Sequence, residues 1–358
     1  MALAVTLAAL VLGALVLPAA AQTPDPGAAP VGSVVVLGDS VAAGEGAGDG
    51  YVYAARSLLP TWSRPAGSRS GAAGTAASDA CGRSDRAYGV LVARALDARV
   101  TNLACSGASF ERGIVLDQRF DRARPDLVLV TAGANSVSFE RAYAYCVLSS
   151  AGLSEAEAER IATSSSVQDA LTTAVGVAAR RVLGSTKPAG ASACTAQNPG
   201  SFLQTTVLDR AATVGTQARD LAASIRARGA TLGRVPDVVF TTYADPLPAA
   251  AASVARCPDG AALGAAQLAF LHEMFLRLNA GLRDALVTAP GVSVAEPDAA
   301  FAGHRWCDPD PWNYGPSIFV TDPGSRAPFH PTPAGQRAFA DAVLAARRGV
   351  LTEWRGLV

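Results

Sequence analysis

The sequence predicts an α/β protein, a three-layer α/β/α sandwich with a central parallel sheet of about five strands. Short runs of β-branched and apolar residues recur along the chain, and their continuous hydrophobicity is typical of strands buried on both faces. Longer segments with the apolar spacing of helices separate these runs. This alternation of strand and helix favours a parallel sheet that is covered by helices on both sides.

Each strand is predicted from a short run of β-branched and apolar residues, and each helix from a longer helix-like pattern. The first strand, SVVVLG, runs directly into Asp39 and Ser40. The predicted strands are residues 33–38, 99–105, 126–133, 237–243 and 292–297. The predicted helices between and after them are residues 86–97, 205–229, 265–286 and 332–348.

Two regions depart from this alternation. Residues 141–200 contain two further helix patterns, SEAEAERIAT and SVQDALTTAVGVAARRVLG, and we expect a helical insertion there. Residues 49–85 are rich in Gly, Ser and Ala and are expected to loop over the sheet. The chain shows neither an internal repeat nor a second domain boundary, so residues 32–358 are expected to form a single domain.

The first residues have the pattern of an export signal. Residues 2–17 are continuously apolar, which suits the core of a signal peptide and is short for a membrane span. The sequence PAAAQ then offers small residues at a cleavage position after Ala21. We therefore expect a signal peptide over residues 1–21, a flexible leader over residues 22–31, and no stable membrane span once the signal is removed.

Composition excludes several classes of function. The chain has 358 residues, 50% of them hydrophobic and 17% charged, with a formal net charge of zero. No block of Lys or Arg stands out, so we expect no nucleic-acid partner. The motifs G-x-S-x-G, G-K-[ST] of the phosphate loop and G-x-G-x-x-G after a strand are absent. No C-x-x-C pair is present, and we expect no metal and no other cofactor.

The chain contains six cysteines, and an even number in an exported protein favours disulfides. Six cysteines allow 15 pairings, and their positions in the sequence do not choose among them. The cysteines are Cys81, Cys105, Cys146, Cys194, Cys257 and Cys307.

Ser40 is the candidate nucleophile. It lies just past the first predicted strand, where side chains of a parallel sheet project into the ligand crevice. Gly44 and Gly46 follow it and let the backbone turn tightly.

The chain has only three histidines that could act as the base for Ser40. His272 lies within a helix pattern and His304 lies close to Cys307, and we expect both to be packing residues. His330 precedes a proline-rich turn and the last predicted helix. This position places an imidazole on a loop near the strand ends, so His330 is the candidate base.

Four motifs resemble the sequence blocks of the SGNH (GDSL) hydrolases. They are LGDSVAAGEG (37–46), ACSGAS (104–109), TAGANSVSF (131–139) and FHPTPAGQ (329–336). A single G-D-S would be weak evidence, but four motifs in the family's order, each at a strand end or a helix entry, are specific. The resemblance covers nearly all of the chain after the signal segment and implies a flavodoxin-like fold.

The resemblance also implies the chemistry of the site. Ser40 would attack an ester carbonyl and form an acyl-enzyme, and His330 would act as the base. The main-chain N–H groups of Ser40 and Gly107 and the side-chain amide of Asn135 would bind the oxyanion.

The cysteine contexts CGRSDRAY and ACSGAS are similar to those of secreted actinobacterial lipases and esterases in this family. That similarity implies three disulfides joined in sequence order. They would be Cys81–Cys105, Cys146–Cys194 and Cys257–Cys307.

The sequence departs from the family's motifs at two positions. An aspartate usually stands three residues before the catalytic histidine, but Ala327 stands there in this chain. Similarity to relatives that lack the aspartate implies a Ser-His dyad, in which the Ala327 carbonyl holds His330. Three aspartates remain alternatives for this support: Asp322, Asp308 and Asp310. Ser136 replaces the aspartate of the third motif, which often orients loops.

The expected function is that of a secreted, monomeric lipase or esterase that acts on carboxylic esters. Neutral charge and the apolar segment FERAYAYCVL (139–148) favour lipid or other acyl esters. Carbohydrate O-acetyl esters are the main alternative substrates. An alternative of another class is an exported binding module with an inactive site, which the missing aspartate before His330 would support.

Overall fold

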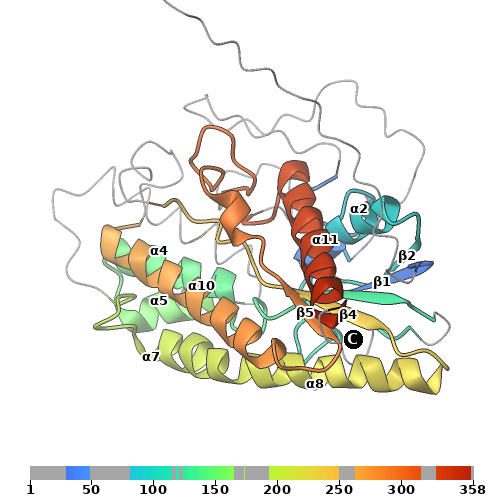
Figure 1. Ribbon diagram of the computed structural model, residues 1–358. Helices are drawn as coiled ribbons and strands as arrows, with labels where there is room; N and C mark the ends of the chain where they lie inside the picture. Colours follow the sequence, from blue (N-terminus) through green and yellow to red (C-terminus); the bar gives the residue numbers. More distant parts are fainter. Residues whose placement is uncertain are drawn as a thin grey trace, which may run out of the picture. The chain divides into compact units, whose positions relative to one another are not determined.

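Five parallel strands form the centre of the computed structural model (Figure 1). The strands lie in the order β2-β1-β3-β4-β5, and each pairs with its neighbours in parallel. The sheet confirms the predicted fold class and places β1 between β2 and β3. The strands are β1 (Ser33–Gly38), β2 (Arg99–Asn102), β3 (Leu127–Thr131), β4 (Asp237–Thr241) and β5 (Val292–Ala295).

The structure describes residues 30–48, 81–114, 118–120, 124–164, 173, 193–249, 263–315 and 328–355. All five predicted strands lie within these ranges, but four of them end earlier than predicted at their carboxyl ends. β3 ends at Thr131, two residues before Gly133, whose φ of 136° is a conformation that favours glycine. These carboxyl ends are where the candidate site residues lie.

Alternate residues of β1 belong to opposite faces of the sheet. Val34 and Val36 pack into one apolar core, and Val35 and Leu37 pack into the other. The first core includes helices α2 (Tyr88–Ala95) and α11 (Pro333–Arg355). The second core includes helices α4 (Phe139–Ser150), α8 (Asp209–Thr231) and α10 (Ala265–Leu286). Helices therefore cover both faces, as the three-layer prediction requires (Figure 1).

Shorter elements lie in the connections between these helices and strands. They are α1 (Ser40–Ala43), α5 (Glu155–Ala162), α7 (Ser201–Leu203), the π-helix η1 (Gln204–Leu208) and the 3-10 helix η3 (Asp298–Phe301). The helix predicted from residue 205 therefore begins with irregular turns before α8. Within the described ranges, no helix is both long and apolar enough to cross a bilayer.

The predicted insertion contains α4 and α5. Ser154 begins α5 with a capping box, in which its side chain accepts the Glu157 N–H and the Glu157 carboxylate accepts the Ser154 N–H. The second helix pattern of this region, residues 166–184, falls almost entirely outside the described residues. Residues 1–29, with the predicted signal peptide, and most of the predicted loop at 49–85 also fall outside them.

Two disulfides are present among the described residues. Cys81–Cys105 joins the segment before α2 to the segment after β2, and Cys146–Cys194 joins α4 to the end of the insertion. Both confirm pairings that the family resemblance implied. The third pairing, Cys257–Cys307, stays a prediction because Cys257 lies outside the described residues.

His272, on α10, is held by the loop that follows β4. Its Nδ1 bonds the carboxylate of Asp245, and its Nε2 lies 2.9 Å from the carbonyl oxygen of Pro248. A carboxylate and a carbonyl are both acceptors, so both ring nitrogens donate and the imidazole is charged. Burial by itself would lower the pKa of His272, but the hydrogen bond and charge of Asp245 outweigh it and raise that pKa above its usual range.

This charged histidine predicts a pH-dependent stability. Because its folded-state pKa is raised, its stabilising effect is complete below the unfolded-state pKa of about 6.5. The effect is lost as the pH rises from there through the raised value. We expect His272→Gln to lower the free energy of unfolding by about 1–2 kcal/mol at pH 6 and by less at pH 8.5. Urea unfolding at both pH values measures the difference.

His304→Gln is the matched control, because the partly exposed His304 ring stacks on Trp312 and bonds only the Asp310 segment. This variant controls for the general effect of replacing an imidazole by an amide. Equal losses of stability at pH 6 and pH 8.5 in His272→Gln would contradict the assignment of a charged ring.

Candidate functional site

A cavity of about 790 Å³ lies at the carboxyl ends of the strands. Its lining comes from the segments that follow β1, β2, β3 and β4 and from the segment that precedes α11. Ser40, Gly107, Asn135 and His330 all line it. The structure therefore brings four of the predicted site residues together, from connections that are far apart in the sequence.

Ser40 is the first residue of α1, directly after the end of β1. Asp39 caps this short helix by accepting a main-chain N–H of its first turn at 3.0 Å. The helix ends at Gly44, and Gly46 follows, with φ angles of 90° and 86°. A Cβ on Gly46 would lie 3.2 Å from the Cβ of His330. Glycine at this position lets the histidine segment pack against the serine segment.

Gly107 lies on the segment after β2. Its φ is 79°, and an added Cβ would meet no atom within 4 Å. Glycine therefore serves the left-handed backbone here, and it keeps the space beside the main chain open. Within the described residues, the N–H groups of Gly107 and Ser40 donate to no acceptor.

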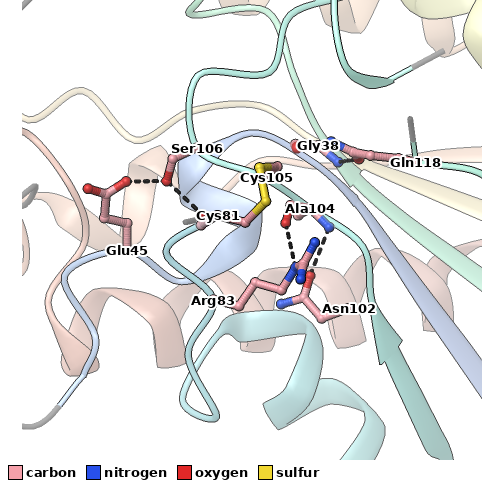
Figure 2. The surroundings of a disulfide bond; sticks show 9 residues. All are labelled: Gly38, Glu45, Cys81, Arg83, Asn102, Ala104, Cys105, Ser106 and Gln118. Carbon is pink, nitrogen blue, oxygen red and sulfur yellow. Dashed lines mark hydrogen bonds between the residues drawn. A yellow bond between two sulfur atoms is a disulfide. The ribbon is translucent and has the colours of Figure 1, made fainter. Parts of the chain in front are cut away.

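Figure 2 shows how the segment before Gly107 is held. The Cys81–Cys105 disulfide anchors it, and the Arg83 Nε donates to the Ala104 carbonyl at 2.9 Å. Ser106 Oγ lies 3.0 Å from the Cys81 carbonyl oxygen and donates to the carboxylate of Glu45. These contacts fix the main chain that leads into Gly107.

Asn135 follows β3, on the other side of β1. One hydrogen of its Nδ2 amide is donated to the Ala108 carbonyl at 3.0 Å, which leaves the second hydrogen for another acceptor. Ser136 Oγ accepts the Phe110 N–H at 3.2 Å and donates to the Glu111 carboxylate at 2.9 Å. Ser136 thus joins two loops of the site, as the aspartate of the family's third motif often does.

His330 is buried, and its Nδ1 lies 2.7 Å from the carbonyl oxygen of Pro328. A carbonyl only accepts, so Nδ1 carries the hydrogen, and in the neutral ring Nε2 is the free acceptor. We expected the carbonyl of Ala327 in this role. Ala327 lies outside the described residues, and the carbonyl found at Nδ1 is that of the next residue along the chain.

The aspartates proposed as alternatives do not bond His330 where they are described. The Asp308 carboxylate accepts the Arg305 N–H at 2.8 Å, and the Asp310 carboxylate accepts the Trp312 Nε1–H at 3.2 Å. Asp322 lies outside the described residues.

Residues 36–338 match the family model of the GDSL-like lipase/acylhydrolase family. The chain belongs to this family. It is therefore a carboxylic ester hydrolase, in agreement with the resemblance seen in its four motifs. No curated protein matches the chain.

Two solved structures are similar to this GDSL-like hydrolase. Phospholipase A1 from Streptomyces albidoflavus NA297 is 20% identical over 88% of this chain and 99% of that chain, with a TM-score of 0.55. An extracellular lipase from Streptomyces rimosus is 20% identical over the same shares, 88% and 99%, with a TM-score of 0.52. At this identity the likeness concerns the fold, and it agrees with the sandwich described above.

Tyr243 joins two loops of this GDSL-like hydrolase. Its hydroxyl donates to the Asp39 carboxylate at 2.5 Å and accepts the Ala134 N–H at 3.0 Å. Burial raises the pKa of Asp39 to about 6, although the Tyr243 hydrogen bond opposes the rise. Because Asp39 and Ala134 directly precede Ser40 and Asn135, one phenol hydroxyl sets the spacing of these two site residues.

Removing this hydroxyl is expected to slow ester hydrolysis. Tyr243→Phe should lower kcat by about tenfold and change KM little, since a small misplacement of reacting groups mainly affects the transition state. Tyr88→Phe is the matched control, because it removes a buried hydroxyl that bonds Thr131 and not a site loop. Equal losses of kcat in the two variants would contradict the role of Tyr243.

An aromatic wall of Phe139, Tyr143, Phe275 and Phe329 stands beside the candidate site. The Phe139 ring lies 4.3 Å from that of Phe275, and the Tyr143 ring lies 4.7 Å from that of Phe329. Phe139, Phe275 and Phe329 line the cavity. Phe139 and Tyr143 belong to α4, so the predicted apolar segment 139–148 does supply part of this wall.

Two residues of the site region were not predicted from the sequence. Gln118 brackets the end of β1, because its Oε1 accepts the Gly38 N–H at 2.6 Å and its Nε2 donates to the Gly38 carbonyl at 2.7 Å. No motif marks Gln118. Tyr243 was included only as the last residue of a predicted strand, and that position at a carboxyl end was the available signal.

Proposed function

We propose that this protein is a secreted serine hydrolase that cleaves carboxylic esters through an acyl-enzyme on Ser40. One observation carries the proposal. Ser40, Gly107, Asn135 and His330 come from four separate connections of the sheet and line a single cavity. A hydroxyl, an imidazole, an amide and an open main-chain segment are the groups that acyl transfer requires.

In the proposed reaction, Ser40 Oγ attacks the ester carbonyl carbon while His330 Nε2 takes the hydroxyl proton. No hydrogen bond joins Ser40 Oγ to His330 Nε2 within the described residues, so the proposed transfer requires the two groups to approach each other when the ester binds. The Pro328 carbonyl keeps the other ring proton on Nδ1. His330 then gives its proton to the leaving alcohol. Water repeats the sequence on the acyl-enzyme and releases the acid, which restores the Ser40 hydroxyl.

The developing oxyanion would accept hydrogen bonds from three donors. They are the N–H groups of Ser40 and Gly107 and the second amide hydrogen of Asn135. The first two groups donate to no acceptor within the described residues, which supports this role. Donors that are fixed before the reaction stabilise the new charge without reorganisation.

The aromatic wall supports acyl esters as the substrate class. Phe139, Phe275 and Phe329 offer apolar surface in the cavity that also holds Ser40 and His330. An acyl chain of several carbons would bury its methylenes there, and each buried methylene contributes about 0.8 kcal/mol. An acetyl group would gain little from such a wall.

A series of p-nitrophenyl esters from acetate to decanoate tests this substrate class. We expect kcat/KM to rise with chain length, and Phe139→Ala to lower kcat/KM for the octanoate ester by about tenfold while leaving the acetate within about threefold. The matched control is Phe301→Ala, which removes a buried phenylalanine from the opposite core. A preference of the wild type for acetate alone would favour carbohydrate O-acetyl esters instead.

Export is part of the proposal. It is supported by the apolar segment at residues 2–17, by the small residues before position 22, and by two disulfides, which form in oxidising compartments. Secreted protein should begin at Gln22. An intact Met1 on protein recovered from the medium would contradict the cleavage.

A further inference from the structure

A buried carboxylate lies beside the second ring nitrogen of His330. Glu45 is 5% exposed, and its Oε2 lies 3.9 Å from His330 Nε2. Among the described residues, it is the only carboxylate within 4 Å of that ring. The other ring nitrogen, Nδ1, meets only the neutral carbonyl of Pro328. The negative charge that faces the imidazole at close range therefore comes from Glu45.

Several contacts fix Glu45 in this place. Its main-chain N–H donates to the Ser40 carbonyl at 3.0 Å, which ties it to the serine segment. Ser106 Oγ donates to its Oε2, beside Gly107 (Figure 2). A Cβ on Gly82 would lie only 3.4 Å from the same oxygen. The carboxylate is thus bonded on one oxygen and packed from a second side.

The other oxygen of this carboxylate, Oε1, is buried and has no hydrogen-bond partner within the described residues. A buried carboxylate with one unpaired oxygen is unfavourable unless a positive charge lies nearby. Among the described residues, the basic group found within 4 Å of this carboxylate is His330, which would become an imidazolium on accepting the proton of Ser40. An imidazolium at His330 would lie 3.9 Å from Glu45 Oε2.

The distance decides what Glu45 can do. A separation of 3.9 Å exceeds that of a hydrogen bond, so Glu45 does not compete for the proton on Nε2. That proton remains available to the leaving alcohol. The attraction between opposite charges persists at this distance, and it is strong where water is excluded.

We propose that Glu45 is a positioning residue that stabilises the imidazolium of His330 during ester cleavage and so replaces the charge of the aspartate that is missing three residues before His330. The inference rests on the proposed roles of Ser40 and His330. It assigns the supporting charge to the serine segment, close to Nε2. The aspartate of the family's motif would instead place that charge at Nδ1.

Two further carboxylates interact with the charge of His330. Asp39 does so from the end of β1, and Glu140 does so from α4, where Arg141 offsets part of its charge. Burial raises the pKa of Asp39 to about 6 and raises that of Glu140 above its usual range. Any test must therefore separate Glu45 from this acidic background.

The test is the pH profile of kcat/KM for p-nitrophenyl butyrate in Glu45→Gln. We expect the plateau rate to fall about tenfold or more, because the imidazolium loses its counter-charge. We also expect the acid limb to move about one unit to lower pH, because a ring without a nearby anion is harder to protonate. A lower rate with an unmoved acid limb would show a merely structural role and overturn the proposal.

Glu140→Gln is the matched control, because it removes a second carboxylate near the ring that makes no close contact with it. An equal shift of the acid limb in this variant would overturn the assignment to Glu45 in favour of a diffuse field. Glu45→Asp keeps the charge but withdraws it by one methylene, and smaller changes in the same direction are expected. If Glu45→Gln fails to fold, an acid limb in Glu45→Asp that matches the wild type overturns the proposal.

Ser40→Ala separates this inference from the proposed function. If Ser40→Ala retains wild-type turnover, the acyl-enzyme mechanism itself fails, and the role of Glu45 fails with it. If Ser40→Ala is inactive and the acid limb of Glu45→Gln is unmoved, only the role of Glu45 fails.

Discussion

Replacing Ser40 by alanine is expected to lower kcat for p-nitrophenyl ester hydrolysis by about 10⁴-fold or more. The variant would keep the cavity and the proposed oxyanion donors but lose the atom that is proposed to form the acyl-enzyme. Removal of the nucleophile in other serine hydrolases costs a factor of this size or larger. Initial rates of wild type and variant, with the spontaneous hydrolysis of the ester subtracted, measure the loss.

Ser109→Ala is the matched control for this experiment, because Ser109 also lines the cavity. The Ser109 Oγ accepts the local Arg112 N–H at 3.1 Å. The Ser109→Ala variant should retain activity within a few-fold of wild type. Labelling by a p-nitrophenyl phosphonate should modify Ser40 in the wild type and nothing in Ser40→Ala. Wild-type turnover no higher than that of Ser40→Ala would indicate a family member with an inactive site.

Asn135→Ala is expected to lower kcat by about 10²–10³-fold and to change KM by much less. The amide would meet a full negative charge only in the transition state, so its loss raises the barrier more than it weakens binding. Steady-state kinetics with a soluble short-chain ester separate the two constants.

The hydrogen bond from Asn135 to the Ala108 carbonyl requires a structural control. Ser136→Ala removes neighbouring contacts between the same loops, to Phe110 and Glu111, without removing the amide. It should lower kcat by less than about tenfold. A rise in KM with an unchanged kcat in Asn135→Ala would argue that the amide binds the substrate rather than the oxyanion.

The sheet and the position of the site were predictable because their determinants are local. In β3 all five residues are buried, so the strand is an unbroken apolar run that the sequence displays directly. The motifs around Ser40, Gly107 and Asn135 each follow such a run. The parallel topology then brings their carboxyl ends to one edge of the sheet.

The carbonyl that holds His330 was not predictable in the same way. Motif spacing relates side chains, whereas this contact depends on how the main chain turns. Phe329, between Pro328 and His330, has a φ of 61°, a left-handed conformation that is uncommon outside glycine. With this turn, the carbonyl two residues before the ring lies at Nδ1. In the family's motif the aspartate stands three residues before the histidine, and in this chain that position is Ala327.

Tyr243 and Glu45 could not be assigned from sequence because their partners are distant along the chain. The Tyr243 hydroxyl bonds a carboxylate that lies 204 residues away. Glu45 lies within a recognised motif, but the ring that it approaches belongs to the opposite end of the chain. The distances between the two residues of each pair follow from the folded structure and not from their positions in the sequence.

The order of the strands has a consequence for how this enzyme fails. The segment that carries Gly107 follows β2, an edge strand whose first three residues are exposed, and the Cys81–Cys105 disulfide holds that segment. An edge strand leaves main-chain groups unpaired on one side, and regions with few buried contacts open at a lower free energy than the core. The rate of ester hydrolysis should therefore depend on whether β2 is paired with β1. During unfolding, activity should be lost while the helical circular-dichroism signal is still intact.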